Sequence, residues 1–545
     1  MSIAGSPSQV PETGSAAAEA LAHEIARRRT FAIISHPDAG KTTLTEKLLL
    51  YGGAIELAGA VKARKGHRST TSDWMAIERQ RGISVSSTVL RFEYRDTVLN
   101  LLDTPGHRDF SEDTYRVLTA CDAALMVLDA AKGIEEQTRK LLAVCRRRGV
   151  PVVTFANKVD RPGMEPLALI DQIEDEMGMA AAPVTWPVGE AGAFEGLYDR
   201  TRRRFVRFTR SAHGATETDE QVAAWADAAV SAAARTRADE EVALLEAAGA
   251  VLARHAFLAG EVTPVYFGSA LANFGVRHVL DALVDLAPAP QPWADAEGAP
   301  RPVSAPFSGF VFKVQANSDP AHRDRIAYVR VCSGCFRRGA PLTIARTGRH
   351  ITTRHAHLPF AQERRPLEEA FPGDVVGLVN AAELRIGDTL YEGPPVTYPP
   401  IPAFSPEHFA VARNLDSGRH KQFRRGLEQL EQEGVVQVLH RRSHRDPAPV
   451  LAAVGPLQFE VAVHRLTEEF RARVELDPPR LGFPQRVRPD DAPAVERLGI
   501  PTLQRGDGAV MAVFESPHQL DFFRRRNPEF PLASLVDGDP FGPAR

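Results

Sequence analysis

Residues 31–43 read Phe-Ala-Ile-Ile-Ser-His-Pro-Asp-Ala-Gly-Lys-Thr-Thr, and this stretch decides the fold of the first half of the chain. Residues 31–35 form a short, nearly all-apolar run, which is typical of a parallel strand covered on both faces. A loop containing Gly40 follows, and a helical pattern begins near Lys41. Backbone N–H groups at such a helix start point into the loop, so the stretch predicts a phosphate-binding loop.

The phosphate loop supplies the first predicted site residues. Lys41 is expected to reach the β- and γ-phosphates of a nucleotide, and the Thr42 hydroxyl is expected to ligate Mg²⁺. Ser35 stands where the usual pattern begins with glycine, but the Gly40 position that lets the backbone approach phosphate is kept. The predicted nucleotide-binding residues of the loop are Ser35, His36, Pro37, Asp38, Ala39, Gly40, Lys41, Thr42 and Thr43.

A second phosphate segment is predicted where the strand at 98–103 ends. Asp103 closes the strand and is followed by Thr104, Pro105 and Gly106. A carboxylate at this place can hold a Mg²⁺-bound water, and a glycine backbone can swing to meet a γ-phosphate. Taken alone, the four residues also fit a strand end followed by an ordinary turn.

A third segment, residues 81–85 (Arg-Gly-Ile-Ser-Val), carries no clear signal for a helix or a strand. Ser84 is the natural second hydroxyl ligand for Mg²⁺ from a loop that the γ-phosphate orders. Taken alone, it reads as a solvated loop serine. The predicted metal ligands are Thr42, Ser84 and Asp103.

Two later segments predict which base is bound. Asp160 follows the apolar strand at 152–157, and a carboxylate there can accept two hydrogens from guanine that adenine does not offer in that arrangement. Asn157 is expected to brace the loop, and the Lys158 stem to cover the base. A second loop follows the last strand. The predicted base-binding residues are Asn157, Lys158, Val159 and Asp160, with Ser269, Ala270 and Leu271.

His107 directly follows Gly106 and is the predicted catalytic residue. Many small GTPases place a glutamine one residue later to orient the attacking water. A histidine here can orient that water or stabilise charge. The alternative is that His107 is structural, as most lone histidines are.

The rest of the chain predicts several domains in series. Apolar runs alternate with amphipathic stretches in the first part, which indicates a doubly wound α/β domain with an insertion at about 197–259. A period-two pattern then predicts a small antiparallel β-barrel. A strand–helix–strand–strand–helix–strand order predicts a ferredoxin-like α+β domain, followed after about 480 by a loop-rich segment with a helix near 517–526. The expected boundaries are 1–27, 28–287, 303–393 and 403–545.

Composition limits the class of protein and its partners. Hydrophobic residues make up 43% and charged residues 25%, with no apolar run long enough for a membrane span. Four cysteines in 545 residues do not form a disulfide framework, which predicts a reducing cytoplasm. The net charge of −3 provides no global attraction to nucleic acid, so such a partner would have to meet local basic patches. The candidate patches are 62–68, 424–425, 441–445 and 524–526.

On these motifs the sequence resembles the translational GTPases. The resemblance rests on residues 35–43, on Asp-Thr-Pro-Gly-His at 103–107 and on the barrel that follows. Within the group, the chain is most similar to the bacterial class II peptide chain release factors, through residues 35–43, 72–85 and 312–325. The resemblance covers roughly residues 28–480 and thins after that.

The resemblance implies a GTPase that binds the ribosome, through its RNA and proteins, after peptide release. It implies that the GTP form promotes departure of a class I peptide chain release factor, and that hydrolysis to GDP and phosphate then lets the protein leave. By similarity, His107 is the catalytic histidine, inserted when ribosomal RNA contacts the domain, and Asp38 helps to bind a monovalent cation. The same resemblance implies a monomer.

Two rival interpretations remain open. One is another ribosomal GTPase, such as a translocase or a ribosome-protection protein, which would need a longer extension than the roughly 65 residues after Asp477. The other is a GTP-binding regulatory subunit with negligible turnover. The ferredoxin-like domain and His107 favour the GTPase.

Overall fold

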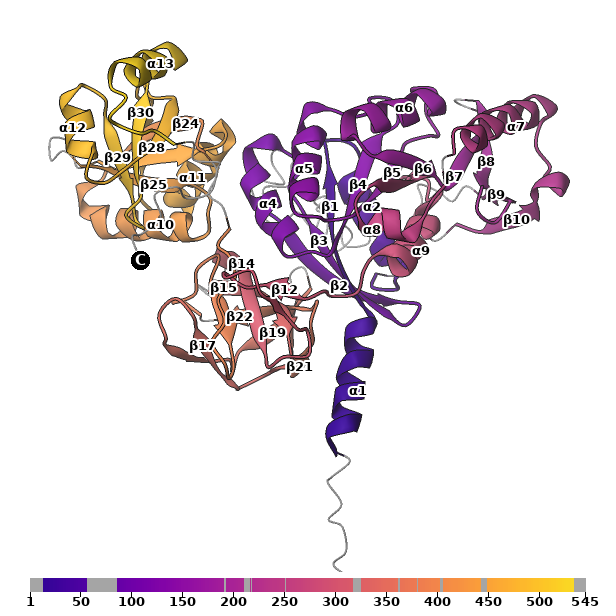
Figure 1. Cartoon of the computed structure of the whole chain (residues 1–545), viewed down its shortest axis with the longest axis horizontal. Coiled ribbons are helices and arrows are strands. Elements are labelled where there is room, and N and C mark those ends of the chain that lie inside the picture. The colour runs from indigo at the N-terminus through magenta and orange to yellow at the C-terminus, as the bar shows by residue number, and fades with distance from the viewer. Residues whose placement is uncertain are drawn as a thin grey trace, which may run out of the picture.

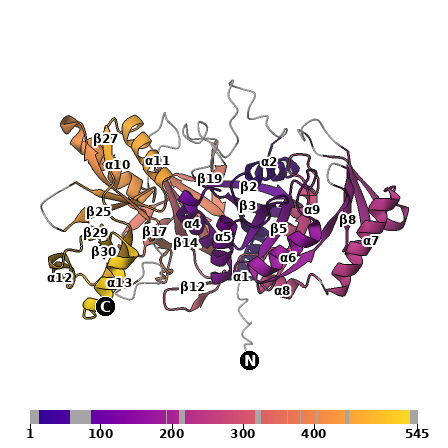
Figure 2. The same cartoon turned by 90° about the horizontal axis from the view of Figure 1, so that it is seen from above.

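The structure is a computed structural model of the chain. No helix in the parts of the chain that it describes is long and apolar enough to cross a membrane. Three bodies follow one another along the chain, and the barrel lies next to the first domain, which the third domain also contacts (Figures 1 and 2). The described residues are 13–55, 86–190, 193–209, 216, 218–249, 251–316, 325–360, 363–379, 381–401, 405–442 and 448–533.

The first domain is built on a seven-stranded sheet that confirms the predicted doubly wound architecture. Six strands are parallel, and β2 pairs antiparallel with β3 at one edge. The inner strands are buried along their length because helices cover both faces. In sheet order the strands are β2 (Thr88–Tyr94), β3 (Thr97–Asp103), β1 (Arg28–Ser35), β4 (Ala123–Asp129), β5 (Val152–Asn157), β11 (Val262–Phe267) and β6 (Ala180–Pro183).

Helices lie on the two faces of this sheet and produce two separate apolar cores. One face carries α2 (Lys41–Tyr51) and α9 (Val276–Leu286), which contact each other. The other carries α4 (Ser111–Thr119), α5 (Glu136–Arg147) and α6 (Pro166–Met177). A further helix, α1 (Thr13–Ala26), precedes β1 and projects from the domain in Figure 1.

The insertion before the last strand of the sheet contains more β-structure than we expected. Its four-stranded antiparallel sheet begins at Thr185, ahead of the expected boundary near 197, and α7 (Ala232–Ala247) packs against it. The side chains of Trp186 and Val188, two residues apart, both point into the core and are 0% exposed. The glycines that follow them are more typical of a loop than of a strand. The strands are β7 (Thr185–Glu190), β8 (Ala193–Asp199), β9 (Arg204–Phe208) and β10 (Glu220–Ala224), and α8 (Arg254–Leu258) follows α7.

The second domain is an eight-stranded antiparallel sheet, as predicted. Its side chains alternate between the barrel core and the outside, which is the period-two pattern seen in the sequence. In sheet order the strands are β18 (His350–Thr352), β17 (Pro341–Ile344), β23 (Thr389–Tyr391), β14 (Ser308–Ala316), β15 (Arg325–Ser333), β22 (Val375–Val379), β19 (Ala356–Phe360) and β20 (Glu363–Pro366).

The third domain begins with the predicted ferredoxin-like unit. Its strands lie in the order β27-β24-β26-β25, with both helices packed against the apolar core. Along the chain the elements are β24 (His408–Asn414), α10 (His420–Gln432), β25 (Gln437–Arg441), β26 (Val450–Ala453), α11 (Pro456–Glu468) and β27 (Val474–Asp477).

The segment after residue 480 is not loop-rich, and that prediction was wrong. Three more strands extend the same sheet in the order β25-β29-β30-β28 and form an apolar core of their own. Each is short and bounded by Pro or Gly, so its pattern was too brief to read as a strand. The elements are β28 (Phe483–Val487), α12 (Ala492–Arg497), β29 (Thr502–Arg505), β30 (Val510–Phe514) and α13 (Pro517–Arg526), the helix that was predicted.

Buried charges join the barrel to the first domain. Arg330 of β15 donates to both carboxylate oxygens of Asp122 at 2.9 and 2.8 Å, and to the carbonyl of Ala120 at 2.5 Å. Arg28 of β1 donates to Asp374 at 2.7 Å. These contacts lie at the starts of the parallel strands, away from the ends where the predicted site residues gather.

Candidate nucleotide-binding site

The phosphate loop joins the end of β1 to the start of α2. Asp38 and Gly40 both have left-handed backbones, with φ of 65° and 99°. Gly40 precedes α2 and offers no side chain to cap it, so the first N–H groups of the helix face the loop. A Cβ on Gly40 would lie 2.2 Å from Nδ2 of Asn157. Both the backbone angle and the close approach therefore require glycine here.

The structure brings Lys41 and Asp103 together at the loop. The Lys41 Nζ donates to Asp103 Oδ1 at 2.6 Å, and the two side chains are 6% and 1% exposed. Thr42 and Thr43 lie in the first turn of α2. Ser84, the third predicted metal ligand, and the segment 81–85 lie outside the described residues.

The segment after β3 lies against the phosphate loop. Thr104 donates to the carbonyl of Ile33 at 2.6 Å, which ties the segment to β1. A Cβ on Gly106 would be 3.6 Å from the Cα of Pro37, so a side chain here would just touch the phosphate loop. His107 follows with its side chain 32% exposed. The predicted catalytic histidine is thus next to the phosphate loop.

Asn157 links the predicted phosphate and base segments through its side-chain amide. Its Nδ2 donates to the carbonyl of Ala39 at 2.7 Å, and its Oδ1 accepts from the backbone N–H of Lys158 at 2.9 Å and of Ala270 at 2.8 Å. Val159 donates its N–H to the carbonyl of Gly268 at 3.2 Å. One buried side chain therefore holds three loops in register.

Each of the two predicted base loops has a residue that is accessible to solvent. Asp160 is partly exposed in the turn after β5, and Leu271 is 47% exposed in the loop after β11. Ser269 is buried, and its backbone exchanges hydrogen bonds of 2.9 Å with that of Phe274. The two predicted base loops are thus joined through Asn157, and each carries a residue that solvent can reach.

Two carboxylates of the site were missed by the sequence reasoning. Asp129 accepts from the Nζ of Lys158 at 2.7 Å, while the same Nζ donates to the carbonyl of Asp38 at 2.6 Å. Burial raises the pKa of Asp129, but the hydrogen bonds from Lys158 and from a backbone N–H outweigh it and hold that pKa below its usual value. Asp129 ends β4 as Asp103 ends β3, so the same signal could have found it.

Glu135 is the second missed carboxylate. It pairs with the Nε2 of His36, which places an acidic group from the start of α5 against the phosphate loop. No sequence motif marks it, because Glu135 follows a turn and not a buried strand.

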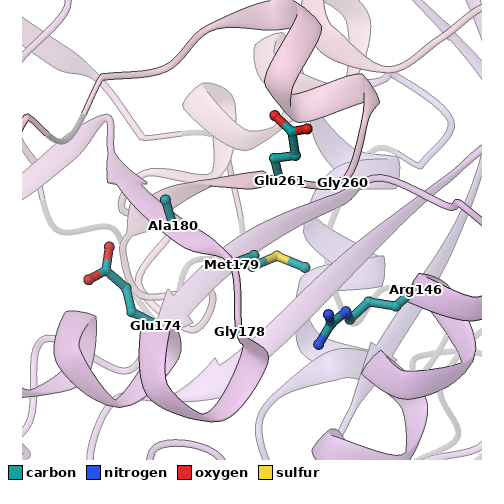
Figure 3. Close-up of a pocket in the computed structure, with 7 residues that line it drawn as sticks. All are labelled: Arg146, Glu174, Gly178, Met179, Ala180, Gly260 and Glu261. Carbon is teal, nitrogen blue, oxygen red and sulfur yellow. The ribbon is translucent and has the colours of Figure 1, made fainter.

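A shallow hollow elsewhere in the first domain is separate from this site (Figure 3). It is lined by Arg146, Glu174, Gly178, Met179, Ala180, Gly260 and Glu261. Ala180 begins β6 and Glu261 precedes β11, so the hollow lies at the amino ends of these parallel strands. Ligands of doubly wound sheets bind at the carboxyl ends, where the phosphate loop lies.

Family models match nearly the whole described architecture. Residues 26–289 match the elongation factor Tu GTP binding domain, and residues 306–393 match elongation factor G domain 2. Residues 398–524 match the class II release factor RF3, C-terminal domain. The fold and the phosphate loop, together with the first two matches, define a GTPase of the translational class.

Relatives that match most of the chain show to which family of translational GTPases it belongs. Proteins named peptide chain release factor 3 are 50% identical in a Synechocystis species and 52% identical in Bordetella pertussis, each over 88% of this chain and 88% and 90% of theirs. The protein of that name in Gloeobacter violaceus is 47% identical over 95% of this chain and 99% of its own length. The chain belongs to the peptide chain release factor 3 family and is a translational GTPase of termination.

A solved crystal structure from Thermus thermophilus shares the fold. It matches with a TM-score of 0.67 and 24% identity, over 89% of this chain and 72% of its own. At this identity the likeness concerns the arrangement of the backbone.

Proposed function

We propose that this chain hydrolyses GTP on the ribosome, and that its GTP form promotes the departure of class I peptide chain release factors after peptide release. The observation that carries the proposal is the Asn157 side chain, which bonds the phosphate loop and both base loops at once. That arrangement presents one surface to the phosphates and the base of a single nucleotide. The family membership supplies the place of the reaction.

The roles of the site residues follow from their chemistry. The Lys41 ammonium would neutralise charge on the β- and γ-phosphates, and the N–H groups at the start of α2 would bind their oxygens. The Asp160 carboxylate would accept from N1–H and the 2-amino group of guanine. His107 would orient the attacking water at the γ-phosphate.

The residues beside Lys41 also suit Mg²⁺. Thr42 offers a hydroxyl and Asp103 a carboxylate, and hard oxygen ligands are those that Mg²⁺ prefers. Ser84 would be the further ligand. Mg²⁺ bound there would neutralise charge between the β- and γ-phosphates, while Lys41 and the loop amides hold the phosphate group in place.

The partners and the location follow from the family and the composition. We assign the ribosome, its RNA and its proteins, as the surface on which hydrolysis is stimulated. All four cysteines are free thiols, which supports action in the reducing cytoplasm. We assign a monomer as the active form.

Stopped-flow measurement of a fluorescent class I factor on post-termination ribosomes tests the proposal. Dissociation should accelerate with this protein and GTP and should not accelerate with GDP, because coupling requires a ribosome state that binds the two factors differently. Equal dissociation rates with and without the protein and GTP would exclude the assigned role. Ribosome binding without GTP turnover would instead favour a regulatory GTP-binding protein.

An Asp160→Asn variant is the matched control that tests which nucleotide base the protein binds. Loss of two hydrogen bonds to a carboxylate should weaken guanine nucleotide binding by about a hundredfold or more. The new amide can donate to the carbonyl of xanthine, so xanthosine triphosphate should restore the accelerated dissociation. A variant with wild-type GTP affinity would contradict the base assignment.

A further inference from the structure

Helix α11 of the third domain begins without an N-cap side chain of its own. The residue before it is Gly455, and the first helical residue, Pro456, has no N–H. Gln458 reaches back to the N–H of Gly455 at 3.1 Å. The N–H of Leu457 donates at 2.8 Å to the Oδ2 of Asp109, a residue of the GTP-binding domain. A carboxylate from another domain thus takes the place of the usual N-cap side chain.

Gly455 makes room for this carboxylate. Its backbone is extended, with φ of −147° and ψ of 160°, which any residue can adopt. A Cβ at this position would lie 2.1 Å from the Cγ of Asp109. A side chain at position 455 and the Asp109 carboxylate therefore cannot occupy this space together.

Two more contacts surround this cap. Phe110 packs against Val461 of α11, and Arg116 of α4 donates to the carbonyl of Gly434 at 3.3 Å. In the structure α11 contacts η2 (Arg108–Phe110), directly before α4, and Figures 1 and 2 both show the third domain on the α4 side of the GTP-binding domain. The segment that carries His107 is thus docked on the third domain.

Asp109 also contacts the imidazole of His107. Its backbone N–H donates to Nδ1 at 3.3 Å, and its Oδ1 lies 3.3 Å from the same nitrogen. A bare Nδ1 can accept from the N–H, and a protonated Nδ1 can donate to the carboxylate, so Asp109 serves both forms of the ring. This leaves Nε2 as the nitrogen that can face a reacting water.

We propose that Asp109 is a positioning residue for GTP hydrolysis, whose carboxylate fixes the His107 ring while it is seated on the start of α11. The inference rests on the proposed function, because it assigns a regulator to the same His107. When the third domain moves away, the carboxylate loses its bond to Leu457 and no longer has a fixed position. The orientation of His107 is thereby coupled to the docking of the third domain.

Three variants of the full chain separate the two contacts of Asp109. Asp109→Asn keeps an oxygen that can accept from Leu457 but loses the carboxylate at Nδ1. Gly455→Ala keeps the carboxylate but excludes it from α11, and Asp109→Ala removes both contacts. Gly482→Ala, in the same domain, is the matched control, because a Cβ there meets no atom within 4 Å in the described structure.

Hydrogen exchange at the Leu457 amide and ribosome-stimulated kinetics are the two readouts. Exchange should become faster in Gly455→Ala and Asp109→Ala and should stay slow in Asp109→Asn and Gly482→Ala. The kcat should fall about 10- to 100-fold in the three test variants with KM and GDP affinity near wild type, as expected of a group that orients another. The double variant Asp109→Ala with Gly455→Ala should lose no more than Asp109→Ala alone.

The outcomes distinguish this proposal from the proposed function. If the wild type itself shows no ribosome-stimulated hydrolysis, the proposed function fails. If the wild type hydrolyses GTP and Asp109→Asn and Gly455→Ala keep its kcat, positioning by Asp109 is overturned. A loss in Gly455→Ala with full kcat in Asp109→Asn would show that docking acts without the carboxylate at Nδ1, which also overturns it.

Discussion

The buried ion pairs of the barrel and the Asp109 contact of the third domain lie at opposite ends of the parallel strands of the GTP-binding domain. The barrel places Arg330 on Asp122, the residue before β4, and Asp374 on Arg28, the first residue of β1. The third domain contacts the segment after the end of β3, where Asp109 lies. The ion pairs of the barrel are remote from the phosphate loop, whereas Asp109 lies two positions after His107.

The two interfaces also use different chemistry. Arg330 and Asp122 are 1% and 6% exposed, and separating such a pair leaves an uncompensated buried charge that costs about 3–5 kcal/mol. The third domain is held by hydrogen bonds to backbone groups and by Phe110, contacts that contribute about 1–3 kcal/mol each. We therefore expect the barrel to move with the GTP-binding domain and the third domain to separate from it more easily.

Arg330→Met should have the largest effect on stability, and it tests the interface between the barrel and the GTP-binding domain. The Asp122 carboxylate would remain buried without its partner, and the free energy of unfolding in urea should fall by about 3–5 kcal/mol. Arg337→Met, at an exposed pair with Glu369, should change it by less than about 1 kcal/mol. Equal effects of the two variants would mean that the buried Arg330–Asp122 pair does not strengthen the interface between the barrel and the GTP-binding domain.

Lys313→Met tests a second contact of the barrel, which lies near the nucleotide end of the sheet because Thr88, next to Ser87, pairs with Asp103. The Nζ of Lys313 donates to the Ser86 hydroxyl at 2.6 Å and to the Ser87 hydroxyl and carbonyl. Loss of these bonds should destabilise the protein by about 1–3 kcal/mol. Isothermal titration should also show weaker binding of a GTP analogue, because Ser86 borders the segment 81–85. Unchanged stability and affinity would show that this second contact contributes neither to folding nor to nucleotide binding.

Phe110→Ala tests the interface between the third domain and the GTP-binding domain. Removing the ring from between Leu457 and Val461 should weaken docking by about 1.5–3 kcal/mol and leave each domain folded. Hydrogen exchange at the Leu457 amide should rise, while unfolding of the GTP-binding domain stays near wild type. Phe522→Ala, at a ring that is 62% exposed in the third domain, is the control and should change neither. Global unfolding of Phe110→Ala would make this interface resemble the barrel interface.

Arg116→Gln should have the smallest effect on docking, although it also removes the partner of Glu112 in α4 and so lowers the stability of the GTP-binding domain itself. The bond of Arg116 to the carbonyl of Gly434 is 3.3 Å long, and losing it should weaken docking by about 1 kcal/mol. Arg424→Gln, at a side chain that is 78% exposed, should have none. A larger effect than that of Phe110→Ala on Leu457 exchange would show that polar contacts dominate the interface.

Sequence reasoning correctly predicted the parts of the molecule whose structure is set by residues close together in the chain. The first-domain strands are runs of apolar residues, and the phosphate loop lies between one such run and a helix within thirteen residues, 31–43. Asp103 and Asn157 are at strand ends, so their meeting at one edge of the sheet follows from the parallel arrangement. Their contacts with Lys41 and Ala39 agree with that expectation.

The parts it missed depend on partners far along the chain. The strands β28 to β30 are four or five residues long and gain their stability from joining an existing sheet. Asp109 looks like an ordinary polar residue until Leu457, 348 residues away, is placed beside it. Periodicity and local motifs carry no information about such a pair.

The glycine at the start of α11 has a consequence for the order of synthesis. A chain made from its amino end completes the GTP-binding domain long before Leu457 is added. The start of helix α11 is then capped by a carboxylate on a surface that has already folded, and not by a side chain of its own. The third domain therefore completes the start of α11 on the first domain, which makes its docking part of its own folding.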